Sequence, residues 1–254
     1  MRFSKAIVRR PGRNLVKGIS SATLGKPDYD NACCQHDRYI AALKRCGVKA
    51  TVLDADERFP DSTFVEDTAV VTEKMAVVCR PGVDSRRGEE SEIAIALRAF
   101  FPRLERIQEP GTLEGGDVLR IGRHFYIGVS QRTNPDGAGQ LLRILSGYGY
   151  TGSLVPLQGM LHLKSGLAYL EKGNLLATGE LVSQPLFSDL NLIEVDASEA
   201  YAANSLWING RVLVPEGFAK TAARIAGLGY PVVTIDVGEF RKLDGGLSCL
   251  SLRF

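Results

Sequence analysis

A hairpin of short apolar strands recurs along the 254 residues at intervals of roughly 40 to 50 residues. The clearest copy carries Asn209-Gly210 at its centre, a pair that favours a two-residue turn between antiparallel strands. Repetition of one small unit indicates that neighbouring units pack side by side. We therefore expect a single α/β domain over residues 1–254. The four uninterrupted hairpins span residues 67–79, 117–128, 166–178 and 205–214.

Helical periodicity occupies the segments between hairpins. The predicted helices are Tyr29–Cys46, Glu89–Phe101, Gly137–Leu145 and Ala219–Leu228. A fifth hairpin is divided between the two ends of the sequence, since residues 246–252 are expected to pair with residues 5–9. Pairing of the ends closes a ring of sheets and removes an exposed edge, as in propellers. An α+β domain with hairpins spaced by chance is the simpler alternative.

The composition argues against several classes of partner. Lys and Arg number 31 against 29 Asp and Glu, so a net charge of +2 gives no reason to expect nucleic acid or an anionic membrane. The first ten residues lack the apolar core of a signal peptide. Five cysteines, an odd number with Cys33 and Cys34 adjacent, suit neither a disulfide framework nor a zinc site. We therefore expect a cytoplasmic protein without a metal or cofactor.

Acidic residues stand at the entrances of the first two hairpins. Asp61, Glu66 and Asp67 precede the first hairpin, and Glu114 precedes the second. Carboxylates offer paired acceptors to the N–H groups of a guanidinium ion. The alternative is that these are solvated loop residues and that Asp61 begins a turn after Pro60. Because the two clusters occupy equivalent places in the repeat, they predict a shared central pocket.

Two further residues have the chemistry of a nucleophile and its partner. Cys249 follows Gly245-Gly246 and a serine, whereas the other four cysteines are expected to be small buried hydrophobes. A nucleophilic thiol needs an acid or base nearby. His162 enters the third hairpin where Glu114 enters the second. A histidine between two leucines is more often structural, so its place in the repeat is what makes it a candidate.

Four motifs then occur together, in order, along the chain. They are Phe-Pro-Asp-Ser-x-Phe-Val-Glu-Asp at 59–67, Glu-x-Gly-Asp at 114–117, Leu-His-Leu-Lys-Ser-Gly at 161–166 and Gly-Gly-x-Ser-Cys at 245–249. With these motifs the sequence resembles the guanidino-group-modifying superfamily and, within it, the bacterial dimethylarginine dimethylaminohydrolases. The resemblance runs from the first strand to Phe254. It implies a five-bladed pseudosymmetric α/β propeller of ββαβ units, in agreement with the repeat.

The resemblance also implies an activity and its catalytic residues. The activity is metal-independent hydrolysis of Nω-methylated arginines to L-citrulline and a methylamine. Cys249 matches the nucleophile, which forms a covalent thiouronium intermediate. His162 matches the general acid that protonates the leaving amine and then, as a base, activates water. Glu114 matches the residue that orients His162 and favours its protonated form.

The remaining residues carried over by resemblance contact the substrate. Asp61, Glu66 and Asp67 match residues that bind its nitrogens or its α-amino group, and Arg86 and Arg132 match those that bind its α-carboxylate. Residues 15–21 match a loop that closes over the pocket. The resemblance further implies contacts with the ligand from the backbone of Ile19, the backbone of Leu243 and Phe64. The expected partner is this small molecule, and a homodimer fits the family.

Related activities are less consistent with the sequence. Arginine deiminases and agmatine deiminases are longer, and the former carry an added helical domain. Agmatine deiminases need no clamp for a carboxylate, which argues against them because Arg86 and Arg132 are present. An amidinotransferase, which needs a second amine as acceptor, stays open as an alternative activity. A non-catalytic propeller of the same fold lacks a matched Cys, His and Glu, all three of which this chain retains.

Overall fold

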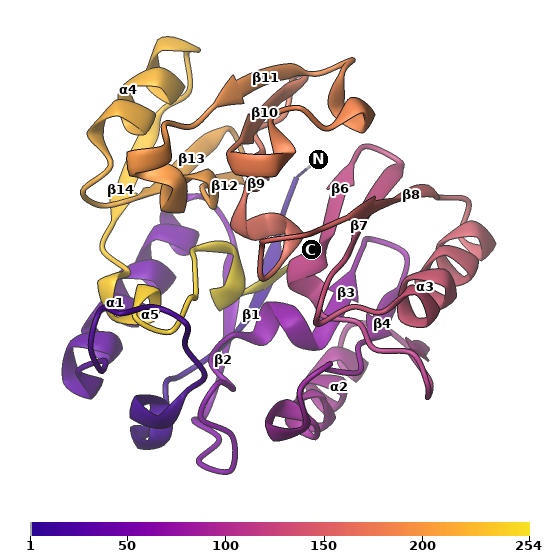
Figure 1. The fold of residues 1–254 in the computed structure, drawn as a ribbon. Coiled ribbons are helices and arrows are strands. Elements are labelled where there is room, and N and C mark those ends of the chain that lie inside the picture. Colours follow the sequence, from indigo (N-terminus) through magenta and orange to yellow (C-terminus); the bar gives the residue numbers. More distant parts are fainter. Residues whose placement is uncertain (1) are drawn as a thin grey trace.

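A computed structural model describes residues 2–254 of the chain. Its strands form five three-stranded sheets, which are arranged as blades around a central axis with the helices on the outer side (Figure 1). In every blade the first strand is antiparallel to the second, and the third is parallel to the second. The α/β fold with five repeated units, predicted from the hairpins and from the family resemblance, is confirmed.

The blades succeed one another along the chain, and within each blade the second strand lies between the first and the third. The strands are β15 (Leu252–Arg253), β1 (Lys5–Arg9) and β2 (Lys49–Leu53); β3 (Ala69–Val71), β4 (Ala76–Val78) and β5 (Leu104–Arg106); β6 (Val118–Ile121), β7 (His124–Val129) and β8 (Thr151–Pro156); β9 (Leu167–Tyr169), β10 (Asn174–Ala177) and β11 (Asn191–Glu194); and β12 (Leu206–Ile208), β13 (Arg211–Pro215) and β14 (Val232–Ile235).

The four predicted helices are present with small shifts at their ends. They are α1 (Tyr29–Arg45), α2 (Glu89–Arg98), α3 (Pro135–Gly147) and α4 (Ala219–Gly227), and a short α5 (Gly238–Arg241) follows β14. The helix α3 begins two residues before the predicted start, because Asn134 accepts a hydrogen bond from Gly137 N at 2.8 Å and caps it. Each of these first four helices makes the crossover between two parallel strands.

The fourth blade departs from this plan. Between β10 and β11 the described chain forms two short 3-10 turns, Gly179–Leu181 and Pro185–Phe187, in place of an α-helix. Their apolar side chains Leu181 and Phe187 are almost fully buried and belong to the same core cluster as Leu175 and Ala177 of β10. The turns therefore cover the blade as the helices cover the others.

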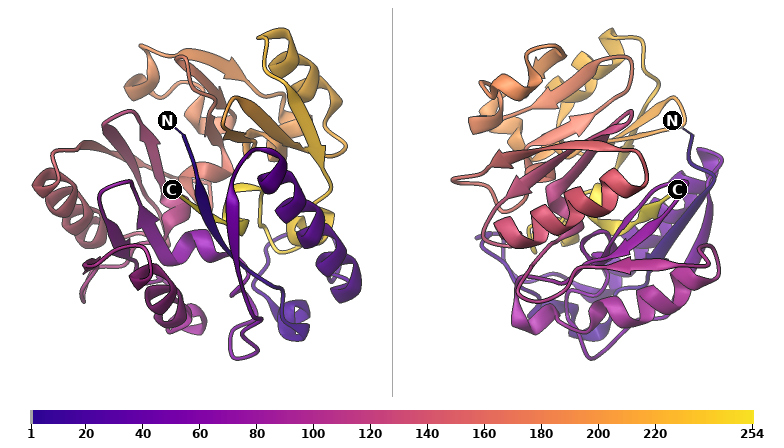
Figure 2. Two further views of the ribbon diagram at one scale, coloured as in Figure 1. Left: turned by 180° about the vertical axis from the view of Figure 1, so that it is seen from behind. Right: turned by 90° about the vertical axis from the view of Figure 1, so that its right-hand side faces the viewer.

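The two ends of the chain meet in one blade. Strand β15 pairs with β1 in the register Ala6 with Arg253 and Ile7 with Leu252, so residues far apart in sequence lie side by side (Figure 2). The predicted pairing of residues 246–252 with residues 5–9 is wrong for most of that segment. Ser248–Leu250 form a 3-10 turn, and Leu252 is the sole residue of 246–252 that pairs within the described sheet. The turn forms because the N–H and C=O groups of Ser248 are bonded to side chains.

A short 3-10 turn leads into the first strand of every blade. The first strands lie next to one another, β15 beside β3, β6 beside β9 and β9 beside β12, and the turns also contact their neighbours. The ring thus gathers five turns at one end of its axis. These turns are Val65–Thr68, Gly115–Asp117, Leu163–Ser165, Ala197–Ala203 and Ser248–Leu250.

The structure shows the state and burial of the cysteines and the character of the helices, about which the composition makes predictions. All five cysteines, each within residues 2–254, carry free thiols. Cys46 and Cys79 are buried as predicted. Cys33 is only half-buried and Cys34 is exposed, because both lie on α1 away from its buried face. Among the described helices, none is both long and apolar enough to cross a bilayer.

Helix α1 buries His36, and this burial disfavours the protonated form of the imidazole ring. Neither ring nitrogen of His36 has a hydrogen-bond partner within the described residues, and burial lowers its pKa to about 4. An unfolded histidine has a pKa of about 6.5, so the unfolded state takes up the proton first. We expect stability to fall as the pH drops from about 6.5 to 4, by up to about 3 kcal/mol from this group.

The matched measurement is urea unfolding of the wild type and of His36→Leu at pH 7 and pH 4.5. The variant should lose less stability between the two pH values than the wild type, because the leucine does not titrate. Equal losses in the two proteins would show that His36 contributes nothing to acid sensitivity.

Candidate active site

The gathered turns bring together residues that the sequence places nearly two hundred positions apart. Asp67 lies within its turn, Glu114 and His162 immediately precede theirs, and Cys249 is the central residue of the last turn. One cavity is lined by most of the residues predicted for the site, namely Ile19, Asp61, Phe64, Asp67, Arg86, Arg132, His162, Leu243 and Cys249. Glu114 is fully buried beneath it.

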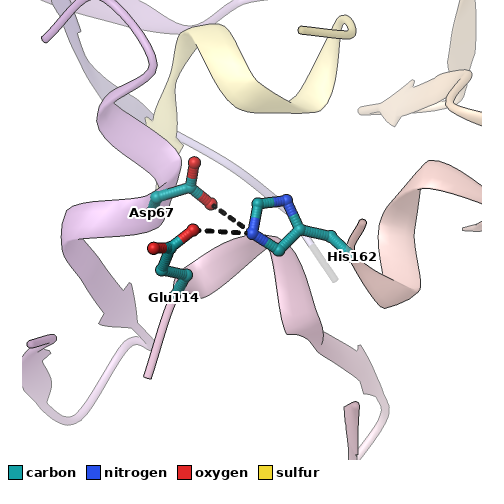
Figure 3. Close-up of side chains that lie close together, drawn as sticks. All are labelled: Asp67, Glu114 and His162. Carbon is teal, nitrogen blue, oxygen red and sulfur yellow. Dashed lines mark hydrogen bonds and ion pairs between the residues drawn. The ribbon is translucent and has the colours of Figure 1, made fainter. Parts of the chain in front are cut away.

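His162 is held between two carboxylates. Its Nε2 lies 2.8 Å from Glu114 Oε2 and 3.9 Å from Asp67 Oδ1, and both carboxylates point toward this one nitrogen (Figure 3). Burial by itself would lower the pKa of His162, but Asp67, Glu114 and Asp117 outweigh it and raise the pKa to about 9. The imidazole is therefore protonated at neutral pH and can donate a proton to a leaving group.

Asp117 supports the histidine from behind. Its carboxylate accepts hydrogen bonds from Leu163 N at 2.9 Å and from Ser130 Oγ at 2.7 Å, and the side chain is fully buried. Because Leu163 follows His162 directly, Asp117 fixes the backbone that carries the ring and adds a negative charge near it. Asp117 was not singled out from the sequence, although it ends the Glu-x-Gly-Asp motif.

The surroundings of Cys249 favour the uncharged form of its thiol, whereas those of His162 favour the charged form of its ring. Burial, with the negative charges of Glu66 and Asp67, raises the pKa of Cys249 to about 12, although Gly246 N donates to Sγ at 3.3 Å and favours the thiolate. At neutral pH the thiol is protonated. A bound cation would counter the two carboxylates and lower this pKa.

The two arginines belong to the site and not to the solvated surface. Arg86 is buried, and it binds Asp67 through Nη1 at 2.7 Å and Glu89 through Nη2 at 2.8 Å. Arg132 Nη1 lies 3.6 Å from Glu114 Oε1. Both arginines are among the residues that line the cavity, and a guanidinium group is suited to bind an anionic group of a ligand.

The carboxylates around His162 are also close enough together to suggest a metal site. Donor atoms of Asp67, Glu114 and His162 all lie within 4.8 Å of one another. The same carboxylates face Arg86, Arg132 and the protonated ring of His162, so positive charge already surrounds them. The donors are arranged as an ion-pair cluster that orients a proton donor.

The predicted loop lies across the mouth of the cavity. Ile19 N donates to both carboxylate oxygens of Asp61, at 3.1 and 3.2 Å, and Ser21 N donates to Asp244 Oδ2 at 2.6 Å. Gly18 packs so closely that a Cβ there would lie 2.8 Å from Asp61 Oδ1. These bonds join the loop to the residues that line the pocket.

Glu66 is placed differently from the other predicted substrate contacts. It lies in an adjoining cavity, which also contains His162 and Cys249. Its Oε1 is bonded to Lys164 Nζ at 2.7 Å and to Arg253 Nη2 at 2.8 Å, and its Oε2 accepts from Ser248 Oγ at 2.6 Å. Both oxygens are thus occupied by other residues of the protein. On its far side Glu66 borders a cavity of about 190 Å³ along the axis.

Sequence reasoning also missed several residues of the two cavities. Leu161 and Gly245 line the first, Asn204 lines the second, and Asp244 lines both. The repeat itself was the signal for Asn204, since this residue precedes the fourth hairpin just as the predicted site residues precede the others.

Comparison with known proteins agrees with this geometry. Residues 25–170 match the family model described as N,N dimethylarginine dimethylhydrolase, eukaryotic. The N(G),N(G)-dimethylarginine dimethylaminohydrolase of Pseudomonas aeruginosa is 53% identical over 99% of this chain and 100% of its own. This chain belongs to the dimethylarginine dimethylaminohydrolase family. The enzyme of the same name from Streptomyces coelicolor is 37% identical, over 100% of this chain and 98% of its own.

A solved structure extends the similarity to three dimensions. A serine-for-cysteine mutant of the Pseudomonas aeruginosa dimethylarginine dimethylaminohydrolase, in complex with citrulline, superimposes with a TM-score of 0.99. The two proteins are 52% identical, and the match covers 100% of both chains. The family resemblance drawn from the four motifs is therefore confirmed.

The charge of Asp117 gives a direct test of the electrostatics in this member of the dimethylarginine dimethylaminohydrolase family. Asp117→Asn keeps the size of the side chain but removes a negative charge that helps raise the pKa of His162. We expect the pKa of His162 to fall from about 9 toward the ordinary value of about 6.5.

The measurement is a pH titration of the histidine ring resonances by NMR. His124 serves as the internal control, because its ring is bonded to Thr151 and Ser153, away from the site. A His162 titration unchanged by Asp117→Asn would mean that Asp67 and Glu114 alone set the pKa.

Proposed function

We propose that this protein hydrolyses Nω,Nω-dimethyl-L-arginine and Nω-monomethyl-L-arginine to L-citrulline and dimethylamine or methylamine. The observation that carries this proposal is the convergence of a thiol and a protonated imidazole in one cavity walled by carboxylates and two arginines. Membership of the family agrees with it. The proposed catalytic residues are Cys249, His162 and Glu114.

The first half of the reaction forms a covalent intermediate. Cys249 releases its proton to solvent once the cationic guanidinium is bound, since His162 is already protonated, and Sγ then attacks the guanidinium carbon. His162, held by Glu114 at 2.8 Å, donates its proton to the methylated nitrogen as the tetrahedral adduct collapses. The C–N bond breaks, dimethylamine leaves, and a thiouronium remains on Cys249.

The second half regenerates the enzyme. His162 is now neutral and can accept a proton from water, whose oxygen attacks the thiouronium carbon. Collapse of the second adduct breaks the C–S bond and releases citrulline, and the thiol and imidazolium are restored. The Glu114 carboxylate stabilises the imidazolium that forms again.

Substrate orientation follows from the charges around the cavity. Asp67 is proposed to bind guanidinium N–H groups beside His162, since its Oδ1 lies 3.9 Å from Nε2. Arg132 and Arg86 are proposed to bind the α-carboxylate, and Asp61, with the backbone of Ile19 and Leu243, the α-amino end. Phe64 supplies an apolar wall to this cavity. Glu66, which lines the adjoining cavity with Cys249, is proposed to bind nitrogens of the substrate there.

The compartment and the assembly are also proposals. Five free thiols fit a reducing compartment, so we propose the cytoplasm. We propose a homodimer from the family resemblance, which light scattering of the purified protein tests directly.

The activity is tested by citrulline formation from dimethylarginine, monomethylarginine and plain arginine, with the wild type and Cys249→Ser. The methylated substrates should yield citrulline, arginine little, and the variant none, because a serine hydroxyl ionises far less readily than a thiol. Faster turnover of plain arginine would make the enzyme a compact deiminase. No citrulline from any of the three would redirect the search to a transferase or a binding protein.

The state of the thiol is tested by titrating thiolate absorbance with and without a cationic substrate analogue. The free enzyme should remain a thiol through neutral pH, because the pKa of Cys249 is raised to about 12. The bound cation should move the midpoint to lower pH by favouring the thiolate. Cys249→Ser corrects for the other thiols. Superimposable curves would exclude activation of the thiol by substrate.

A further inference from the structure

The fifth blade, β12 to β14, contributes to the gathered turns a residue that the proposed mechanism does not use. In the other blades the segment before the first strand carries Asp67, Glu114, His162 or Cys249. In the fifth it carries Asn204, which directly follows the turn Ala197–Ala203. Asn204 is buried and lines the cavity that contains His162 and Cys249.

The carboxamide of Asn204 is bonded at both ends. Its Oδ1 accepts from Ser248 N at 2.9 Å. Its Nδ2 donates to Lys164 O at 2.8 Å and to Ser248 Oγ at 3.0 Å. A backbone N–H can only donate and a carbonyl can only accept, so these partners determine the orientation of the amide.

These bonds connect the two reacting segments. Ser248 directly precedes Cys249, and Lys164 lies two residues after His162. Ser248 Oγ also donates to Glu66, and Ser248 O accepts from Arg253 Nη1 at 2.9 Å. Every polar group of Ser248 is thus engaged. Asn204 joins this network to the backbone of the His162 segment, and Glu66 reaches the same segment through the side chain of Lys164.

The chain makes room for Asn204 on the side facing Cys249. A Cβ on Gly246 would lie 2.5 Å from Asn204 Oδ1, closer than side chains tolerate. Gly246 is also the residue whose N–H faces Cys249 Sγ. The missing side chain lets the carboxamide and the glycine turn approach each other closely.

We propose that Asn204 is a positioning residue, which fixes the Cys249 turn relative to the His162 segment for the reaction. This role rests on the proposed function. Small displacements of reacting groups cost large factors in rate, so loss of the link should act on turnover more than on substrate affinity.

A charge introduced at Asn204 would act on the ionisation of the Cys249 thiol together with the charged and titratable groups that already surround this thiol. They come from three of the gathered turns, from the residue before one of these turns and from the loop after α5, namely Glu66, Asp67, His162, Lys164, Tyr201 and Asp244. Asn204→Asp keeps the shape and the acceptor for Ser248 N, but it loses the donor and adds a negative charge to this group. That charge should disfavour the thiolate of Cys249.

The test compares Asn204→Ala and Asn204→Asp with Ser205→Ala in a Cys34→Ser background. Ser205 is an equally buried neighbour whose hydroxyl bonds to Ala202 O within its own segment, so it reports on general loss of packing. For Asn204→Ala we expect kcat on dimethylarginine to fall on the order of 10- to 100-fold with KM within about twofold, and Ser205→Ala to stay near the wild type.

A second readout needs no turnover. Alkylation of Cys249 by iodoacetamide, located by peptide mapping, should require higher pH in Asn204→Asp than in the wild type or Asn204→Ala. Equal losses of kcat in Asn204→Ala and Ser205→Ala, a change confined to KM, or an unshifted alkylation profile in Asn204→Asp would each overturn the proposal. If the wild type makes no citrulline, the proposed function fails, and the alkylation profiles still decide the placement of Asn204.

Gly246→Ala supplies an independent check if Asn204→Ala folds poorly. The added methyl should push the carboxamide away and lower kcat by a similar factor. In the double variant Asn204→Ala/Gly246→Ala the two losses should not add, because the clash is gone. Additive losses would mean that Gly246 and Asn204 act separately, contrary to the proposal.

Discussion

The pairing of β15 with β1 is the constraint on which the site depends. It binds the last residues of the chain to the first strand and closes the ring of blades. Arg253 of β15 then reaches back to Glu66 and to Ser248, so the same short strand that completes the fold also fixes the turn carrying Cys249. A C-terminal segment of this length would have little conformational preference of its own, and its geometry comes from these tertiary bonds.

The second feature of the site is its concentration of buried charge. Asp61, Glu66, Asp67, Glu114 and Asp117 are all buried around the gathered turns, where an unpaired carboxylate would be costly. Arg86, Lys164, Arg253 and the protonated His162 pair with them. Burial, together with the carboxylates, raises the pKa of Cys249, and the carboxylates outweigh the effect of burial to raise the pKa of His162. The pocket is thereby suited to a cationic ligand and disfavours a free thiolate.

Such a site separates two requirements that a cysteine hydrolase must meet. The nucleophile must be a thiolate during attack, yet a permanently ionised thiol would react with other electrophiles. In the proposed mechanism the charge of a bound guanidinium favours the thiolate, which the carboxylates of the protein disfavour. The imidazole proposed as the proton donor, by contrast, is charged before substrate arrives, because Glu114 and Asp67 hold it in this form.

The repeated unit and four of the helices follow from the sequence alone, and the sequence also predicts Cys249 and His162 as the catalytic pair. Hairpin periodicity and helical periodicity are local properties, so α1 to α4 and the Asn209-Gly210 turn could be predicted from residues a few positions apart. The four motifs likewise identified the family, and they predict its site residues in this chain. The tertiary structure decided what depends on contacts across blades. The last segment became a 3-10 turn because Asn204 and Arg253 bind Ser248, Glu66 was directed to Lys164 and Arg253, and Asn204 and Asp117 joined the site. No local pattern encodes these partners, since each bond joins segments that meet only when the ring closes.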